Sequence, residues 1–283
     1  MNDLLRRCLV TVRTGGLLYT SANPVRVQLV TDLPRILLQA AFLIMLGRTA
    51  GGVGAAADAL TGAAAFAVSS LVVVGLCDVP MDDEWSGTQY RIQTGVLPPV
   101  LVHLCRALPH PLAAIVAGAA VLAVDGPLLG LGATSAALVP AAPLYLLMAL
   151  SSSGFGLAVA VLAVGRRADV LFGNLAAYLV LALTGVLAPR GAGLPWLVPV
   201  ADALPVSHGL RAVRALVDHR PWAVQASLEA AVGIGWLLVA VLLARWRMRV
   251  LRRPRPRPRP SRPAGTAPLR GGDAPHRQKE ETP

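Results

Sequence analysis

Charged residues are scarce in this chain of 283 residues, because only 14% are Asp, Glu, Lys or Arg whereas 55% are hydrophobic. A water-soluble domain of this length holds about a quarter charged residues, and its apolar and polar residues alternate at a helical or strand period. Here long apolar runs have no polar face, and the mean hydropathy is +0.60. The composition excludes an ordinary soluble core and indicates an integral membrane protein.

Clusters of catalytic or metal-binding residues are also lacking. The five histidines form no HExxH pair, and Cys8, Cys77 and Cys105 lie far apart and outside any CxxC pattern. Neither a disulfide framework, a zinc site nor an intramembrane hydrolase is indicated. We expect no catalytic residue and no metal site in this chain.

Lysine is nearly absent, and the single one is Lys279. A P-loop requires a lysine that reaches the β- and γ-phosphates of a nucleotide, directly after its second glycine. The sequence has no such motif, so we expect that the chain binds no ATP cofactor itself. Energy from ATP would have to come through another polypeptide.

The basic excess, a net charge of +11, is concentrated at one end of the chain. Twelve of the 26 basic residues lie at or beyond Arg245. The stretch "RRPRPRPRPSRP" alternates Arg with Pro, which excludes helix and favours an extended chain. We expect residues 247–283 to form a basic, disordered cytoplasmic tail whose partner is anionic membrane lipid and not nucleic acid.

Six apolar runs approach the roughly 20 residues that a helix needs to cross a bilayer. They lie within residues 33–246 and predict an all-α membrane domain with six transmembrane helices. The predicted spans are Leu33–Gly52, Leu60–Cys77, Leu108–Val124, Leu138–Val164, Val170–Leu187 and Ser227–Leu243.

The arginines and Lys279 between these spans predict the orientation. With the N-terminus inside, 21 basic residues fall on the cytoplasmic side and five on the outer side. Because basic residues are enriched in cytoplasmic loops, we expect both termini in the cytoplasm and the protein in the plasma membrane.

The N-terminal segment, residues 1–32, is predicted to be cytoplasmic and begins with the pattern of an amphipathic helix lying on the inner leaflet. Gly15 and Gly16 are expected to end this helix. An ordinary solvated helix is the alternative. The apolar face comprises Leu4, Leu5, Cys8, Leu9 and Val12, and the opposite face carries Arg6, Arg7 and Arg13.

A broken outer segment lies between the fifth and sixth spans, where Pro195, Pro199 and Pro205 leave only pieces too short to cross. Ser207 can N-cap a short helix in this segment. The helix would carry Leu210, Val213, Leu216 and Val217 on one face and Arg211, Arg214 and Asp218 on the other. The segment either dips into the outer leaflet or forms a plain external loop.

The stretch "PMDDEWSGTQYRIQTGVLPP" follows the second span and gathers the acidic residues Asp82, Asp83 and Glu84. Acidic side chains are favoured near the start of a helix by the backbone dipole, so a short cytoplasmic docking helix is one reading. The other is that these carboxylates end the span in water.

Acidic residues are rare within the spans. Glu229 lies near the outer end of the last span, where it is either a helix-packing residue or part of an ion pathway. Asp125 has no acidic partner nearby in the sequence. Ser151–Ser153 and Asn174 could line a path for a cargo, although such residues equally serve close helix packing. An ion-coupled secondary transporter is therefore an alternative function.

Three stretches together resemble the permease subunit of ABC-2 type transporters, a family that includes daunorubicin-type drug exporters and glycan exporters. The first is Glu84, Gly87-Thr88 and Pro98 after the second span. The second, "GFGLAVAVLAVGRRADVLFGNLAAYLVLALTGVLAP", resembles the fourth and fifth spans of the family. The third is "LPWLVPVADALPVSHGLRAVRAL", which contains Leu204, Pro205, His208, Leu210, Ala212 and Arg214. The resemblance covers residues 1–253.

The resemblance implies a permease dimer that works with a separate ABC ATPase subunit, in which ATP and Mg²⁺ are bound. It implies export of a hydrophobic or amphipathic compound, such as a drug, an antibiotic, a lipid or a glycan. The loop with Asp82, Asp83, Glu84, Gly87 and Thr88 would contact the ATPase. The outer segment would contain Pro205, His208, Arg211 and Arg214 as its site residues.

Overall fold

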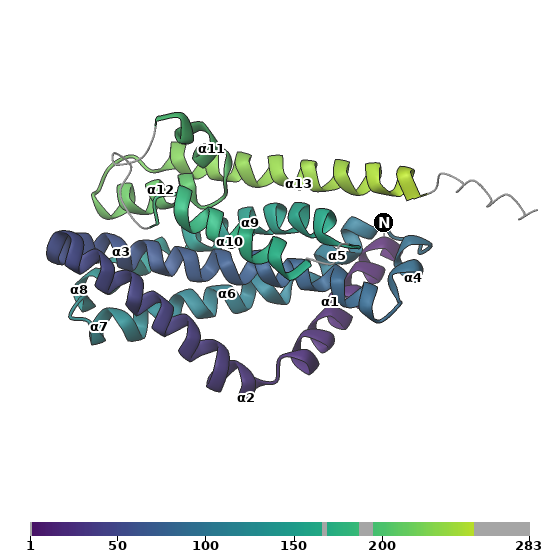
Figure 1. Ribbon diagram of the computed structural model, residues 1–283, viewed down its shortest axis with the longest axis horizontal. Helices are drawn as coiled ribbons and strands as arrows, with labels where there is room; N and C mark the ends of the chain where they lie inside the picture. Colours follow the sequence, from purple (N-terminus) through teal and green to yellow (C-terminus); the bar gives the residue numbers. More distant parts are fainter. Residues whose placement is uncertain (1, 166–168, 187–194, 252–283) are drawn as a thin grey trace, which may run out of the picture.

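The structure is a computed structural model that describes residues 2–165, 169–186 and 195–251. These residues form helices joined by short turns, and no strand occurs among them (Figure 1). The predicted all-α class is confirmed for this part of the chain. Of the predicted basic tail, residues 252–283 lie outside the described residues.

The helices differ widely in length. The longer ones are α1 (Asn2–Ala22), α3 (Leu33–Trp85), α5 (Pro99–Ala107), α6 (Pro109–Ala120), α9 (Ala142–Ala163), α10 (Asp169–Leu183), α12 (Ser207–Val217) and α13 (Ala223–Leu251). The shorter α-helical pieces are α2 (Val25–Val27), α4 (Gln89–Gln93), α7 (Gly126–Leu128), α8 (Gly132–Leu138) and α11 (Val198–Ala203). The π-helical turns are η1 (Gln28–Asp32) and η2 (Val121–Asp125), and the 3₁₀ turns are η3 (Val139–Ala141) and η4 (Pro195–Leu197).

Four helical stretches of the described chain are long and apolar enough to cross a membrane. They are Val25–Trp85, Pro99–Leu128, Gly132–Ala163 and Ala223–Arg247, and a shorter apolar helix covers Leu171–Leu183. Large apolar side chains on these helices are exposed, among them Phe42 and Ile234. A surface of this kind is stable in lipid and not in water. The protein is therefore embedded in a membrane and crosses it several times.

The first two predicted spans form one element, α3, which bends in its middle. The helical conformation is interrupted at Gly51 (φ −154°, ψ 24°) and Gly52 (φ 70°, ψ −155°), and glycine tolerates the positive φ of the second. The two arms diverge from this bend in Figure 1. A Cβ on Gly47 would lie 2.6 Å from Ala59 Cβ, so the arms touch beside the bend. The connection predicted around residues 53–59 is thus helical.

The second arm of α3 lies at the centre of the bundle and packs against α6, α9 and α10, while α13 packs on the far side of α9 (Figure 1). Small residues allow these close approaches. A Cβ on Gly156 of α9 would lie 3.0 Å from Val73 Cα of α3. A Cβ on Gly154 would lie 2.7 Å from the carbonyl oxygen of Gly233 on α13. Bulkier side chains here would separate α9 from its neighbours.

The serines of α9 take part in this packing. Ser152 is buried, and its Oγ lies 2.9 Å from Ser69 Oγ on α3. Ser151 is buried beside Gly233, and Ser153 donates to the carbonyl oxygen of Ala149 at 2.9 Å. These contacts support the helix-packing reading of the three serines.

Helix α1 is longer than the sequence predicts, because it continues through Gly15 and Gly16 to Ala22. Tertiary contact explains the difference. A Cβ at position 15 would lie 2.5 Å from the Cα and carbonyl oxygen of Arg106, so this glycine lets α1 approach the backbone of α5. Cys8 and Val12 are half-buried, whereas Leu4, Leu5 and Leu9 are exposed as on a lipid-facing helix.

Candidate functional site

The C-terminus of α3 ends in a turn that requires Gly87. The Thr88 N–H donates to the Asp83 carbonyl at 2.9 Å, and the Gly87 N–H donates to the Glu84 carbonyl at 3.1 Å. This pair of hydrogen bonds is the Schellman motif, whose penultimate residue takes a left-handed conformation. Gly87 has φ +68°, and open space surrounds it. The sequence "WSGT" therefore stops the helix and turns the chain toward α4.

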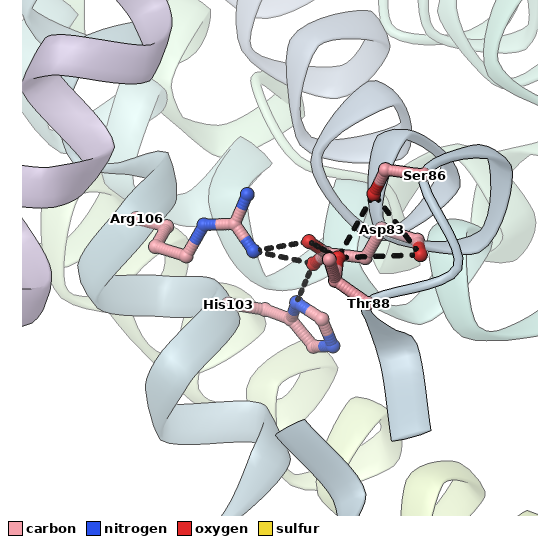
Figure 2. Close-up of polar contacts among 5 residues, drawn as sticks. All are labelled: Asp83, Ser86, Thr88, His103 and Arg106. Atoms are coloured by element: carbon pink, nitrogen blue, oxygen red, sulfur yellow. Dashed lines mark hydrogen bonds and ion pairs between the residues drawn. The ribbon is translucent and has the colours of Figure 1, made fainter. Parts of the chain in front are cut away.

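Asp83, in the last turn of α3, is the centre of a buried ion pair (Figure 2). Its side chain is only 4% exposed, and Arg106 Nη1 on α5 lies 2.5 Å from both carboxylate oxygens. A buried carboxylate is stable only when it is paired and hydrogen-bonded. This pair thus fixes α5 against the end of α3.

Two further side chains surround the Asp83 carboxylate in Figure 2. The Thr88 hydroxyl donates to Asp83 Oδ1 at 3.1 Å and lies 2.9 Å from the Ser86 hydroxyl. His103 Nδ1 on α5 lies 3.7 Å from Asp83 Oδ2. The turn after α3 and the helix α5 are thereby held by one carboxylate.

Glu84 makes a second long-range contact, to the end of α9. The Gly165 N–H donates to Glu84 Oε2 at 2.7 Å. Arg247 on α13 donates to the carbonyl oxygens of Val161 and Val164 at the same end of α9. A helix C-terminus favours a cation, so Arg247 stabilises α9 through both charge and hydrogen bonds. The ends of α3, α9 and α13 are therefore linked by Glu84 and Arg247.

A groove runs between α1 and the α4–α5 region beside these contacts. One part has a volume of about 670 Å³ and is lined by α1 residues including Thr11, together with Asp82, Thr88 and Arg91. A neighbouring part of about 540 Å³ shares Thr11 and Arg91 and adds Arg6. Both charge signs therefore line it, which suits a protein segment that carries charges of its own.

The structure separates the acidic residues that the sequence groups together. Asp82 is exposed and lines the groove, whereas Asp83 is buried and Glu84 is bonded to the Gly165 backbone. Gly87 and Thr88 belong to the turn beside the groove. The acids occupy the last turn of α3 and not the start of a new helix, so favourable interaction with a helix N-terminus does not explain them.

Sequence reasoning missed the partners of these acids, His103 and Arg106 on α5 and Gly165 and Arg247 farther along the chain. His103 and Arg106 lie three positions apart, a spacing that places both on one helical face. That spacing is a signal the sequence contains. The contacts of Gly165 and Arg247 depend on how α9 and α13 pack, which no local pattern shows.

In the outer segment, Glu229 caps the N-terminus of α12. The N–H groups of Val206 and Gly209 donate to Glu229 Oε1 and Oε2 at 2.8 and 2.9 Å, and the glutamate is fully buried. Val206 is the N-cap, with φ +77°, and no side chain of the segment caps the helix. The prediction that Ser207 is the N-cap is wrong, because Ser207 is the first helical residue and a carboxylate from α13 satisfies the free N–H groups.

The other predicted outer residues lie around this cap. Pro205 precedes α12 and is buried, and His208 Nδ1 lies 3.1 Å from Gln225 Oε1. Arg211 donates to Asp202 at 2.7 Å and lies beside His208. Arg214 pairs with Asp58 at 3.7 Å and donates to the Gly185 carbonyl at 3.1 Å. Helix α12 is thus a packed part of the bundle.

Comparison with known families agrees with this architecture. The model of the ABC-2 type transporter family matches residues 20–217, which is well over half of the chain, so the protein belongs to the ABC-2 type transporter family. A search of curated proteins and a search of solved structures found no match. The matched region includes both arms of α3, the α4 and α5 side of the groove, and helix α12.

Family membership defines the role of the chain in general terms. It is the membrane component of a transporter of the ABC type and is a transport protein, not itself a catalyst. Membership also implies partnership with an ABC ATPase. Among the described residues, no group of three or more His, Cys, Asp or Glu could hold a metal ion.

Proposed function

We propose that this protein is the permease subunit of an ATP-driven exporter in the plasma membrane. Its cargo would be a hydrophobic or amphipathic compound, such as a drug or antibiotic, a lipid or a glycan. The observation that supports this most strongly is the family match over residues 20–217, combined with the groove at the end of the helix bundle where a partner can bind.

Six membrane spans fit the structure when the two arms of α3 are counted separately. The remaining four would be α6 with the turns that follow it, then α9, α10 and α13. The distribution of basic residues supports cytoplasmic termini, since 21 of the 26 lie on the inner side in this arrangement. On this topology the groove beside α4 and α5 faces the cytoplasm.

The ATPase would dock on this cytoplasmic groove and on the turn after α3. Trp85, Tyr90 and Val96 are 68%, 65% and 81% exposed there, and aromatic and apolar residues of this kind are typical of protein interfaces. ATP and Mg²⁺ would be bound by the ATPase. By analogy with the family, we propose a permease homodimer that carries two ATPase subunits.

The contacts behind the groove supply a route for motion. The Asp83–Arg106 pair joins the turn to α5, and the Glu84–Gly165 hydrogen bond joins it to the end of α9. Closure of the ATPases on ATP would displace the turn, and these two links would carry the displacement into α3 and α9 together. Tilting of these helices would open a path for the cargo.

The experiment is reconstitution of the chain in vesicles with and without an ATPase encoded beside it. We expect the ATPase to co-purify with the tagged permease, and cargo movement to require both ATP and the ATPase. Transport by this chain alone, driven by a proton or sodium gradient, would instead establish the ion-coupled alternative. A reporter fused near Gly191 should be external and one at Arg253 cytoplasmic, and a cytoplasmic Gly191 reporter would contradict the six-span topology.

A further inference from the structure

A cavity of about 320 Å³ lies between α6 and α9, with residues of α3, η2, α7, α8 and η3 completing its wall. The short helices α7 and α8 lie at the end of the bundle where α3 bends (Figure 1). Arg48, close to this bend, donates to the Leu129 carbonyl at 3.1 Å, which fixes the segment between α7 and α8 there. In the proposed topology this is the outer end of the spans.

The cavity has a buried floor and an exposed rim. Val68, Leu138 and Tyr145 belong to the lining and are buried. The exposed part of the lining consists largely of alanines, namely Ala119, Ala123, Ala136 and Ala142. Exposed side chains on membrane-spanning helices face lipid, and alanines are too small to close an opening. We therefore call this the lateral cavity, because it is reached from the bilayer.

The lining of the lateral cavity is apolar, and no Asp, Glu, Lys or Arg belongs to it. Two lining side chains, Ser135 and Tyr145, carry a hydroxyl group. The Tyr145 hydroxyl is already used, because it donates to the Thr61 carbonyl at 3.3 Å. A charged ligand would find no counter-charge on this wall, so the cavity favours an uncharged ligand.

Ser135 is the polar group that this ligand would meet. Its side chain is only 8% exposed, and its Oγ has no hydrogen-bond partner in the protein. A Cβ on Gly126 would overlap Ser135 Oγ, so the hydroxyl lies against the start of α7, next to Pro127 of the lining. A buried hydroxyl is costly without a partner, and a hydroxyl can both donate and accept. A ligand with a hydroxyl group of its own would satisfy it.

The volume sets the size of the ligand. An apolar protein cavity of about 150 Å³ holds one benzene molecule, which has six non-hydrogen atoms. The lateral cavity, at about 320 Å³, has roughly twice this room. It therefore suits a compound of about ten to twelve non-hydrogen atoms.

We infer that the lateral cavity binds a small, uncharged, largely apolar alcohol that enters from the bilayer and forms a hydrogen bond with Ser135. An acyl chain of a lipid fits the apolar wall less well, because it would leave Ser135 Oγ without a partner. The inference goes beyond the proposed function, since this binding requires neither the ATPase nor transport.

Photolabelling of the full chain can locate such a ligand. The purified protein would be placed in phosphatidylcholine nanodiscs with a diazirine-bearing octanol, irradiated, and mapped by peptide mass spectrometry. We expect labelling of the α6, α8 and α9 peptides that line the cavity to saturate and to be displaced by unlabelled octanol. The octane analogue with the same diazirine should label them at least about threefold more weakly at equal concentration in the lipid. Labelling at Phe42, which is exposed on α3, should rise linearly and serves as the lipid-phase reference.

A serine-to-alanine substitution tests the hydrogen bond. In Ser135→Ala, we expect the alcohol and octane analogues to label the cavity equally. The variant should be at least as stable as the wild type in thermal unfolding, because it removes a buried hydroxyl without a partner. Ser227→Ala is the matched control, since Ser227 bonds to the Val224 carbonyl on α13 and lies outside the cavity. It should keep the preference of the wild type for the alcohol.

A third probe tests the charge of the ligand. Asp125 precedes Gly126 and is buried, and its Oδ2 has no hydrogen-bond partner, although the residue is not part of the lining. An ammonium group in place of the hydroxyl of the same probe would be attracted if this carboxylate acted on the cavity. We expect the ammonium probe to label the cavity more weakly than the alcohol.

Several results would overturn the inference. They are labelling of the cavity that does not saturate, equal labelling by the alcohol and octane analogues in the wild type, stronger labelling by the ammonium probe, and an unchanged alcohol preference in Ser135→Ala. The three probes are compared on the wild-type chain, so they decide the question even if a variant misfolds. Saturable labelling without ATP-dependent export would reject the proposed function alone, and export without saturable labelling would reject the lateral cavity alone.

Discussion

The backbone N–H of Gly165 donates a hydrogen bond of 2.7 Å to Oε2 of Glu84, which lies 81 positions earlier in the chain. The bond joins the end of α3 to the chain immediately after α9. The Arg247 guanidinium also lies beside Gly165. Glu84, which we propose as part of the ATPase contact, therefore also connects the end of α3 to the end of α9.

Two substitutions of Glu84 distinguish loss of this hydrogen bond from loss of the negative charge. Glu84→Gln keeps an oxygen acceptor for Gly165, whereas Glu84→Lys removes it and places a second cation near Arg247. We expect Glu84→Lys to lower the free energy of unfolding by about 1–2 kcal/mol and Glu84→Gln by less than half of that. Thermal unfolding in detergent measures both. Equal stability of the two variants would show that the hydrogen bond contributes nothing.

Two substitutions at Gly87 test whether a partner approaches this turn. Gly87→Ala and Gly87→Trp share the strain of a side chain at φ +68°, about 1 kcal/mol, because open space surrounds the position. Only tryptophan adds bulk. We expect ATPase recovery with tagged permease to fall much more for Gly87→Trp than for Gly87→Ala at matched membrane levels. Equal recovery would place the ATPase away from the turn.

The carboxylate of Glu229 should be essential for helix α12. Glu229→Ala leaves the buried N–H groups of Val206 and Gly209 without an acceptor, which we expect to cost about 2–4 kcal/mol of stability. Glu229→Gln retains one acceptor oxygen and should cost less. Thermal unfolding gives the difference, and proteolysis of the outer segment checks whether the loss is local. A Glu229→Ala protein as stable as the wild type would contradict the capping role.

Oxidation should join α1 to α5. Cys8 and Cys105 interact across these two helices and are both half-buried, while Cys77 is buried. Disulfides form between thiols whose helices already lie in contact. Treatment of the membranes with copper phenanthroline should therefore give a Cys8–Cys105 bridge within one chain, detected by peptide mass mapping, and leave Cys77 reduced. Absence of this bridge, with Cys8 oxidised elsewhere, would contradict the packing of α1 on α5.

Much of the helical content could be predicted from the sequence, because it depends on runs of neighbouring residues. The predicted spans coincide broadly with the arms of α3 and with α6, α9, α10 and α13, since apolar side chains remain stable in lipid wherever they lie. Helix ends were less predictable. Gly15 and Gly16 do not end α1. Helix α1 packs so closely against the backbone of Arg106 that only a glycine fits at position 15.

The candidate site could be predicted only as a region. The sequence singled out Gly87 and the acids before it as parts of a short docking helix, where the structure has the end of α3 and a turn, and it treated Asp82, Asp83 and Glu84 as equivalent. Packing gives them separate environments, because successive residues of a helix point in directions about 100° apart. Asp83 meets Arg106, Glu84 meets Gly165, and Asp82 faces the groove.

The sequence by itself determined that this protein is a helical membrane protein, since bilayer thickness acts on local composition, and the placement of its basic residues predicted a cytoplasmic C-terminal end. Only the tertiary structure decided where its few charged residues lie. A charge within a membrane bundle needs a specific partner, and the partners of Asp83 and Glu229 come from other helices. In both cases the two partners are 23 positions apart in the sequence. Such contacts depend on how the helices pack, and hydrophobic periodicity does not specify that packing.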